Sequence, residues 1–287
     1  PVGMYLIPAL LGGASQVGRD WALLAQNSLI LGLLLAQGCI LFEGRRARLI
    51  ALIIFVMFSG LDIFGSILSE IATGTANWNH IERWASNYQY SAHITQLFWA
   101  PQHAFAGWTA ALLYLLWRRK LVPIGLFAAS LPLVALWSPL VLFGALPFAA
   151  FAGVQTLLTK TWDRRDVALS MIATLLAIPT FLYLSTDAAA VGGHLRPPTL
   201  LGYALIMLFE VIPFLLPLLN DRTGGTARTT ILIAGLCLFL MPLWVIGVSN
   251  DFQMRASIMP LAITALAFAD WASRSRTSRE KAFLTTD

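Results

Sequence analysis

The polar residues best suited to chemistry lie in a short part of an otherwise apolar chain. His80 and Glu82 stand two positions apart in the segment 71–95, and His103 follows shortly after it. Histidine and glutamate are common general acids and bases in enzymes, because both can exchange protons near neutral pH once their surroundings are tuned. The residue types therefore favour an acid–base or proton-transfer site.

Asp62 is the fourth candidate for this chemistry. It lies in the sequence FSGLDIFG, within the apolar segment 48–69 and about fifteen residues from the segment's start. An ionisable group inside a membrane segment is costly and indicates function by default. A structural role, in which Asp62 pairs with an arginine or caps a helix broken at Gly60, stays open. The predicted catalytic residues are therefore Asp62, His80, Glu82 and His103.

Further polar residues near the same ends of the apolar segments are candidates for binding a substrate. They are Arg83, His93, Gln102, His194, Arg196, Asn250, Asp251 and Arg255. Arginine grips phosphate in two places, so Arg83, Arg196 and Arg255 are predicted to hold a phosphate. Asn250 and Asp251 would orient hydroxyl groups of the same substrate. The alternatives are local ion pairs with neighbouring acids and simple snorkelling of long side chains to the membrane surface.

No metal or cofactor is predicted. The histidines at 80, 93 and 103 are too widely spaced for the close pairs of a typical zinc site. Cys39 and Cys237 both fall in apolar segments, which indicates small core residues rather than a disulfide framework. Glu210 also lies in an apolar segment, before Pro213 and Pro217. It is either part of a proton relay or ion site, or a paired glutamate that holds helices together.

These residues must be positioned by helices that cross a membrane. The chain of 287 residues is 58% hydrophobic and only 11% charged, and its mean hydropathy is +0.73. A soluble domain carries roughly 25% charged residues. The composition predicts an all-α, polytopic transmembrane bundle. About ten apolar segments are recognisable, at 1–11, 21–42, 48–69, 96–117, 121–136, 140–159, 167–184, 200–219, 229–247 and 256–272.

The basic residues alternate between the connections, and this predicts a topology. Fifteen of the nineteen lie in one set of connections, which includes Arg45, Arg118, Lys160 and Arg228, and in the tail 273–287; the other set has only four. Basic residues in short loops stay in the cytoplasm. The rich set and the C-terminus are therefore predicted to be cytoplasmic, and the long polar loop 71–95 to be outside. The positive-inside bias also accounts for the net charge of +5 without nucleic acid.

The predicted organisation is one transmembrane domain over 1–287, with the outer loop 71–95 and a basic cytoplasmic tail at 273–287. Because the chain starts at Pro1 inside an apolar segment, we expect helices that precede it in the full protein. Residues that take part in function could lie in that part.

Three separated motifs resemble a family of uncharacterised bacterial polytopic membrane proteins. They are FSGLDIFG (58–65), HIERWASNYQYSAHITQLFWAPQHAFAGW (80–108) and SNDFQMRASIMPL (249–261). The layout is also similar to membrane glycosyltransferases of the GT-C type, which have many helices, an outward-facing active site and a polyprenyl-phosphate sugar donor. These resemblances imply a bacterial inner-membrane location and mark the motifs as the polar centres of the chain.

The favoured hypothesis is a membrane glycosyltransferase-like enzyme. It would move a sugar from a polyprenyl-phosphate donor to an envelope glycan or lipid at the outer face. A carboxylate or histidine would deprotonate the acceptor, and arginines would stabilise the phosphate leaving group. The alternative is a proton-coupled transporter or lipid flippase, for which Asp62 and Glu210 would be the proton sites. A non-catalytic scaffold is a third possibility, although it would not need the polar outer residues.

Overall fold

The computed structural model describes residues 3–85, 88–186, 192–195, 199–221, 225–247 and 250–284. The chain is nearly all-α, as the composition predicts. Its helices are α1 (Gly3–Gly12), α2 (Gln16–Ile40), α3 (Arg45–Met57), α4 (Asp62–Thr73), α5 (His93–Trp99), α6 (Pro101–Arg118), α7 (Ile124–Trp137), α8 (Pro139–Thr159), α9 (Arg164–Ser185), α10 (Leu200–Ile206), α11 (Ile212–Asn220), α12 (Arg228–Leu240), α13 (Asp251–Ala256) and α14 (Ile258–Leu284).

Five short elements complete the described chain. They are the 3-10 turns η1 (Ile81–Arg83) and η4 (Met241–Leu243), the π-helical turn η3 (Met207–Val211), and the strands β1 (Gly193–Leu195) and β2 (Trp244–Ile246). The strands pair antiparallel, with His194 opposite Val245. This small sheet departs from a purely helical bundle. It also shortens the apolar segment predicted at 229–247, since α12 ends at Leu240 and a strand follows.

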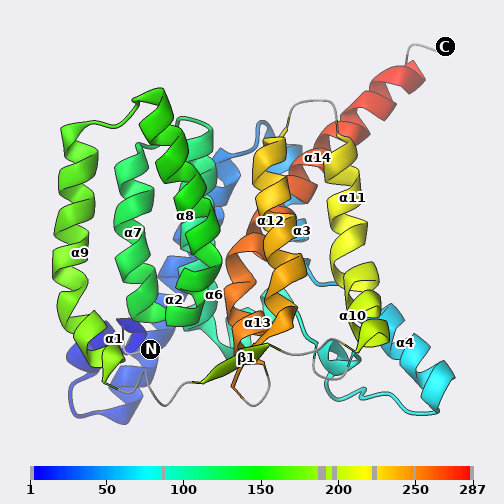
Figure 1. The fold of residues 1–287 in the computed structure, drawn as a ribbon, viewed down its shortest axis with the longest axis horizontal. Helices are drawn as coiled ribbons and strands as arrows, with labels where there is room; N and C mark the ends of the chain where they lie inside the picture. The colour runs from blue at the N-terminus through cyan, green and yellow to red at the C-terminus, as the bar shows by residue number, and fades with distance from the viewer. Residues whose placement is uncertain are drawn as a thin grey trace.

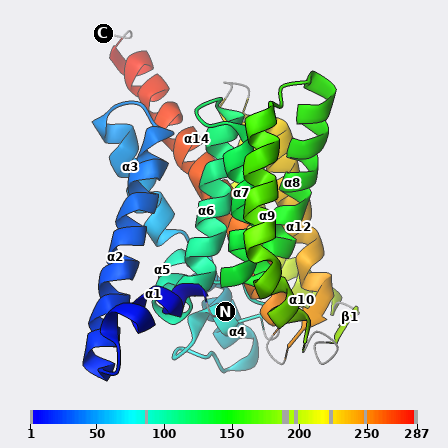
Figure 2. The same cartoon turned by 90° about the vertical axis from the view of Figure 1, so that its left-hand side faces the viewer.

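Within the described residues, four helical stretches are long and apolar enough to cross a membrane. They are Gln16–Ile40, Arg45–Thr73, Pro139–Thr159 and Leu200–Asn220. The structure does not confirm the ten spans predicted from the sequence. α7 has 14 residues, a length of about 21 Å against a hydrocarbon core of about 30 Å. α1 has ten residues, or about 15 Å, and lies beside the start of α2 (Figure 2).

The outer faces of the bundle are strongly apolar, as expected for contact with lipid. On α9, Ile172, Leu175, Leu176 and Leu182 are all exposed. The interior is formed by small and apolar side chains around α14, in which residues 258–269 are almost entirely buried. A chain with a buried core and a large apolar surface as well is typical of a membrane protein, because lipid covers that surface.

The connections collect at two ends of the bundle (Figure 1). We call one the basic end: there α2 is followed by α3, α8 by α9 and α11 by α12, and α14 runs outward to the C-terminus. Arg45, Arg118, Lys160 and Arg228 stand at the helix termini of this end. The opposite end carries α1, α4, α13 and β1 (Figure 1). Alternate connections therefore lie at opposite ends, as their difference in basic content predicts.

Two of the four long stretches are interrupted, and their interruptions meet. Phe58–Leu61 separates α3 from α4, and the π-helical turn η3 separates α10 from α11. The Leu61 N–H donates to the Phe209 carbonyl at 3.1 Å, and the His93 N–H donates to the Phe58 carbonyl at 2.9 Å. Backbone groups freed from a helix inside a membrane need such partners, since lipid provides none. The two breaks thus support each other.

Candidate functional site

Three buried carboxylates gather where the two interrupted helices meet. Asp62 is the first residue of α4, Glu82 lies in η1, and Glu210 lies in the π-helical turn η3. Their exposed fractions are 5%, 7% and 2%. Asp62 acts electrostatically on both glutamates, and Glu82 acts on Glu210. We call these three residues the carboxylate cluster.

Asp62 is held by its own sequence neighbourhood. The Ser59 hydroxyl donates to Asp62 Oδ2 at 2.5 Å. As the first residue of α4, Asp62 also lies at the positive end of that helix, which stabilises a negative charge. The motif FSGLD therefore folds into a helix break followed by a helix start, and it delivers a carboxylate to the cluster.

Glu82 accepts hydrogen bonds from the segment that follows it. The Gln89 side chain donates to Oε2 and the Ala92 N–H donates to Oε1, both at 3.0 Å. Burial raises the pKa of the Glu82 carboxyl above its ordinary value of 4.5. Hydrogen bonds from Thr95, Ala92 and Gln89 oppose that rise, and the negative charge of Asp62 adds to it. The net result is a carboxyl that holds its proton to a higher pH than an exposed glutamate does.

Glu210 has one oxygen satisfied and one that is not. The Trp84 indole N–H donates to Oε1 at 3.1 Å. Oε2 is buried and accepts no hydrogen bond within the described part of the chain, although the Asp62 carboxyl lies within hydrogen-bonding reach. Two ionised carboxylates cannot bond to each other, since both only accept. A proton on either one supplies the missing hydrogen bond.

Two glycines leave room for the side chains of Glu210 and Trp84. A Cβ atom on Gly60 would overlap the Glu210 carboxylate, and a Cβ on Gly65 would overlap the Trp84 indole. Both glycines belong to the motif FSGLDIFG. The motif thus supplies the carboxylate of Asp62 and also the space that Glu210 and Trp84 occupy.

A cavity of about 600 Å³ adjoins the cluster toward the opposite end of the bundle. Trp84 lines this cavity and also bonds to Glu210, so one side chain contacts both the cavity and the cluster. The other walls come from α4, the segment after η1, β1 and α10. They are formed by Gly65, Leu68, Ser69, Ala72, Thr73, Ala85, Tyr88, His194, Thr199, Leu201, Gly202 and Leu205.

A second polar group forms away from the cluster, around His103 on α6. The His103 ring Nδ1 pairs with the Ser138 hydroxyl at 2.7 Å, and the charge of Arg255 acts on that ring. Arg255 is bound to Asp251 at 2.9 Å within α13. Asn250 caps the same helix by accepting from the Gln253 N–H. The predicted His103, Asn250, Asp251 and Arg255 therefore share one region.

The remaining predicted residues are scattered. His80 and Arg83 are exposed. His93 is buried among the rings of Phe55, Phe58 and Trp108, which indicates a packing role. The Gln102 side-chain oxygen is buried without a hydrogen bond in the described part of the chain. Arg196 lies outside the described residues, and His194 borders the cavity.

Within the described ranges, the three carboxylates of the cluster form no salt bridge with an arginine or lysine. Within the same ranges, no three acidic, histidine or cysteine side chains are arranged to hold a metal ion. The chemistry that this arrangement supports is the binding and release of protons by carboxyl groups that share them.

Three members of the site were not predicted as site residues from the sequence: Glu210, Trp84 and Gln89. Glu210 carried a signal, as an ionisable residue in an apolar segment. Trp84 and Gln89 lie inside the second motif, at 80–108, but their types alone pointed to a membrane-surface aromatic and an ordinary polar loop residue.

Comparison of the chain with families of proteins, with curated proteins and with solved structures finds no match.

Proposed function

We propose that the chain is a proton-coupled membrane carrier, with Asp62 and Glu210 as its shared proton site. The observation that carries the proposal is the buried Glu210 oxygen that lacks a donor while the Asp62 carboxyl is within reach. Holding both groups ionised and buried without a cation is costly. Taking up one proton removes one charge and forms one hydrogen bond.

The surrounding backbone supports a carrier for a second reason. Carriers often place their ion or proton sites where two interrupted helices meet inside the membrane, because the breaks can change shape during transport. Here the breaks at Phe58–Leu61 and Met207–Val211 are bonded to each other and flank the carboxyl pair. The basic end would face the cytoplasm, and the cavity beside Trp84 would receive the transported molecule from the other side.

The aromatic and apolar walls of that cavity, next to a cluster of acids, fit an amphiphilic cation. Such a cargo would contact Trp84 and Tyr88 and would compete with the proton for the cluster. Lipophilic cations are therefore the first probes to use.

A membrane glycosyltransferase of GT-C type, with about ten spans and a polyprenyl-phosphate sugar donor, is a second proposal. The cavity favours it, because Trp84 and Tyr88 offer aromatic faces for a sugar and the carboxylate cluster offers a base. The pairing of Arg255 with Asp251 weighs against it, since that arginine was expected to hold the donor phosphate.

The first experiment tests the proton site without a cargo. Infrared difference spectra of the purified full chain, recorded between two pH values, should contain the carbonyl band of a protonated carboxyl. That band should be lost or shifted in Asp62→Asn and in Glu210→Gln. Glu70→Gln is the matched control, because Glu70 is an exposed carboxylate of the same helix, α4. An unchanged band in both cluster variants would refute the shared proton site.

The second experiment separates the two functions. Proteoliposomes with the full chain should take up ethidium when a pH gradient is imposed, and Asp62→Asn should abolish the effect of the gradient while Glu70→Gln keeps it. In parallel, membranes are supplied with radiolabelled sugar on a polyprenyl-phosphate donor. Sugar transfer that depends on Asp62, together with ethidium uptake that does not respond to the pH gradient, would refute the carrier and support the glycosyltransferase.

A further inference from the structure

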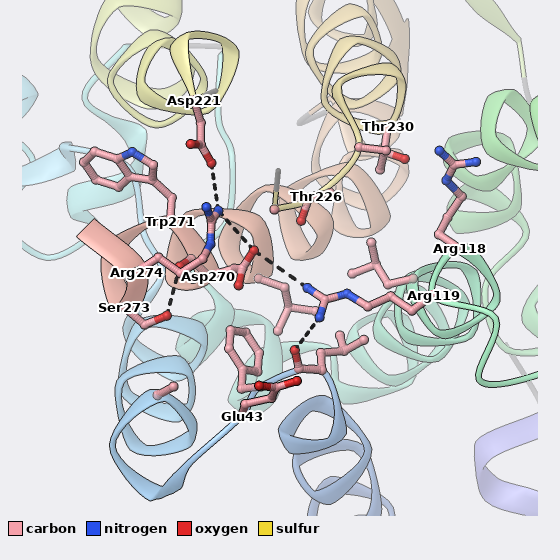
Figure 3. Close-up of a pocket in the computed structure, with 17 residues that line it drawn as sticks. Glu43, Arg118, Arg119, Asp221, Thr226, Thr230, Asp270, Trp271, Ser273 and Arg274 are labelled. Carbon is pink, nitrogen blue, oxygen red and sulfur yellow. Dashed lines mark hydrogen bonds and ion pairs between the residues drawn. The ribbon is translucent and has the colours of Figure 1, made fainter. Parts of the chain in front are cut away.

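A second cavity, away from the carboxylate cluster, lies at the basic end and has a volume of about 930 Å³. It is enclosed by the connection between α2 and α3, the end of α6, the start of α12 and the middle of α14 (Figure 3). Its charged lining consists of three arginines and three acids: Arg118, Arg119, Arg274, Glu43, Asp221 and Asp270. Neither proposed function uses any of them.

Most of this charge is compensated within the protein. Arg274 binds Asp221 at 2.7 Å and Asp270 at 3.2 Å. Asp270 is also 3.7 Å from Arg119, whose other contact is a hydrogen bond to the Leu41 carbonyl at 2.9 Å. Arg119 is therefore only a distant partner of Asp270, which Arg274 binds more closely. Its charge is only partly neutralised.

Arg118 has no acidic partner among the described residues. It donates to the neutral Gln155 side chain at 2.5 Å and to the Thr229 hydroxyl at 3.4 Å. Its guanidinium also rests on the rings of Trp117 and Phe151. Its Nε is buried and lacks an acceptor within the described chain. Glu43, the remaining acid, is exposed and stands apart from Arg118 in Figure 3.

An arginine fixed by aromatic rings, with a buried donor unused, is suited to an anion that comes from outside the protein. Phosphate is the anion that best fits, since it accepts several hydrogen bonds and matches the planar guanidinium. A buried donor without an acceptor is also costly, and a bound phosphate would remove that cost.

The other walls indicate what the phosphate is attached to. Leu41, Phe42, Leu115 and Leu266 bring apolar surface into the same cavity. Basic pockets between helices at the cytoplasmic end of membrane proteins bind the head groups of anionic lipids. We propose that this cavity binds a phosphate ester, with its phosphate at Arg118 and Arg119 and its apolar part against these side chains.

The test uses the purified full chain in a neutral detergent, with binding followed by native mass spectrometry. Three probes separate the sources of the phosphate: dioctanoyl phosphatidylglycerol, glycerol 3-phosphate, and dioctanoylglycerol, which lacks phosphate. We expect the first to bind and the third not to. Binding of glycerol 3-phosphate as tight as that of the lipid would identify a soluble phosphate ester as the ligand, and weaker binding would identify a lipid head group.

The variants locate the site. Arg118→Gln should weaken binding about tenfold or more, because one charge-assisted contact is lost. Arg119→Gln should weaken it as well, and Arg118→Lys should restore only part of the affinity. Arg164→Gln is the matched control, an exposed arginine of the basic end outside the cavity. Size-exclusion profiles and thermal unfolding verify that each variant is folded.

Three results would overturn the proposal. One is tight binding of dioctanoylglycerol, which would show that only the apolar part is recognised. Another is unchanged affinity in both Arg118→Gln and Arg119→Gln. The third is an equal loss in Arg164→Gln, which would indicate diffuse surface charge instead of a site.

Discussion

The indole N–H of Trp84 donates a 3.1 Å hydrogen bond to Glu210, a residue 126 positions later in the chain. Trp84 directly follows the 3-10 turn η1, so this contact joins the start of the second motif to the π-helical turn between α10 and α11. Trp84 lines the cavity as well. A molecule that moves the indole would therefore remove the hydrogen bond that Trp84 donates to the Glu210 carboxylate and change how readily that group holds a proton.

The first prediction concerns the energy of this contact. Trp84→Phe should lower the free energy of unfolding by about 1–3 kcal/mol, because it leaves a buried acceptor unpaired. In a Glu210→Met background the same change should cost less, since the acceptor is already gone. A double-mutant cycle, measured by unfolding of the purified chain in detergent, should give a coupling energy of about 1 kcal/mol or more. Additive effects would mean that the two side chains do not interact.

The second prediction uses the glycine at the helix break. Gly60→Ala should destabilise the protein by about 1–3 kcal/mol through overpacking, because its Cβ would overlap the Glu210 carboxylate. Gly32→Ala is the matched control, as no atom lies near its added Cβ in α2. That change should be neutral or stabilise the helix by roughly 0.5–1 kcal/mol.

A compensating change makes the prediction for Gly60 specific. In a Glu210→Ala background, Gly60→Ala should cost much less, since the carboxylate that it meets has been removed. An equal cost in both backgrounds, measured by thermal unfolding, would place the strain elsewhere in the helix break.

The third prediction is a pH dependence that arises from Glu82. Its pKa is raised above 4.5 in the folded protein by burial, so the folded state binds more protons than the unfolded state at pH values just above 4.5. Stability therefore falls as the pH rises through this window, and it levels off once Glu82 is ionised in both states.

Glu82→Gln removes this titration. Its free energy of unfolding should decline less steeply with pH above 4.5 than that of the wild type, as measured by denaturant unfolding at a series of pH values. Exposed Glu70→Gln should leave the slope unchanged. A steeper decline in Glu82→Gln would mean that the Glu82 carboxyl favours its ionised form in the folded protein.

Local sequence patterns predicted part of this site for clear physical reasons. Asp62 stood out because ionisable residues are rare in apolar segments, and Glu82 because it stands beside His80 in the polar loop 71–95. The structure brings the two carboxylates together. The alternation of basic loops predicted which connections share an end, since charge in loops follows the side of the membrane. Both signals can be recognised without knowing which helices are neighbours.

What the sequence could not predict depends on contacts between distant segments. Glu210 joins Asp62 only because a π-helical turn packs against the break at Phe58–Leu61. His93 and Glu82 belong to the same motif, yet one packs among aromatic rings and the other enters the cluster. Apolarity also cannot separate a helix that crosses a membrane from one that does not. For this reason the strand β2 was included in a predicted span.

The last prediction tests the orientation of the bundle. In a chain whose Cys39 and Cys237 have been replaced by alanine, single cysteines are introduced by Arg164→Cys at the basic end and Gly192→Cys at the opposite end. Arg164 is exposed, and a Cβ at Gly192 meets no other atom, so neither change should disturb packing.

A membrane-impermeant maleimide added to intact cells should label only Gly192→Cys. Arg164→Cys should react only after the membrane is opened, because the loops that carry most of the basic residues stay in the cytoplasm. Labelling of both positions in intact cells would remove the basis for assigning the cavity beside Trp84 to the outer side, and labelling of Arg164→Cys alone would reverse the orientation.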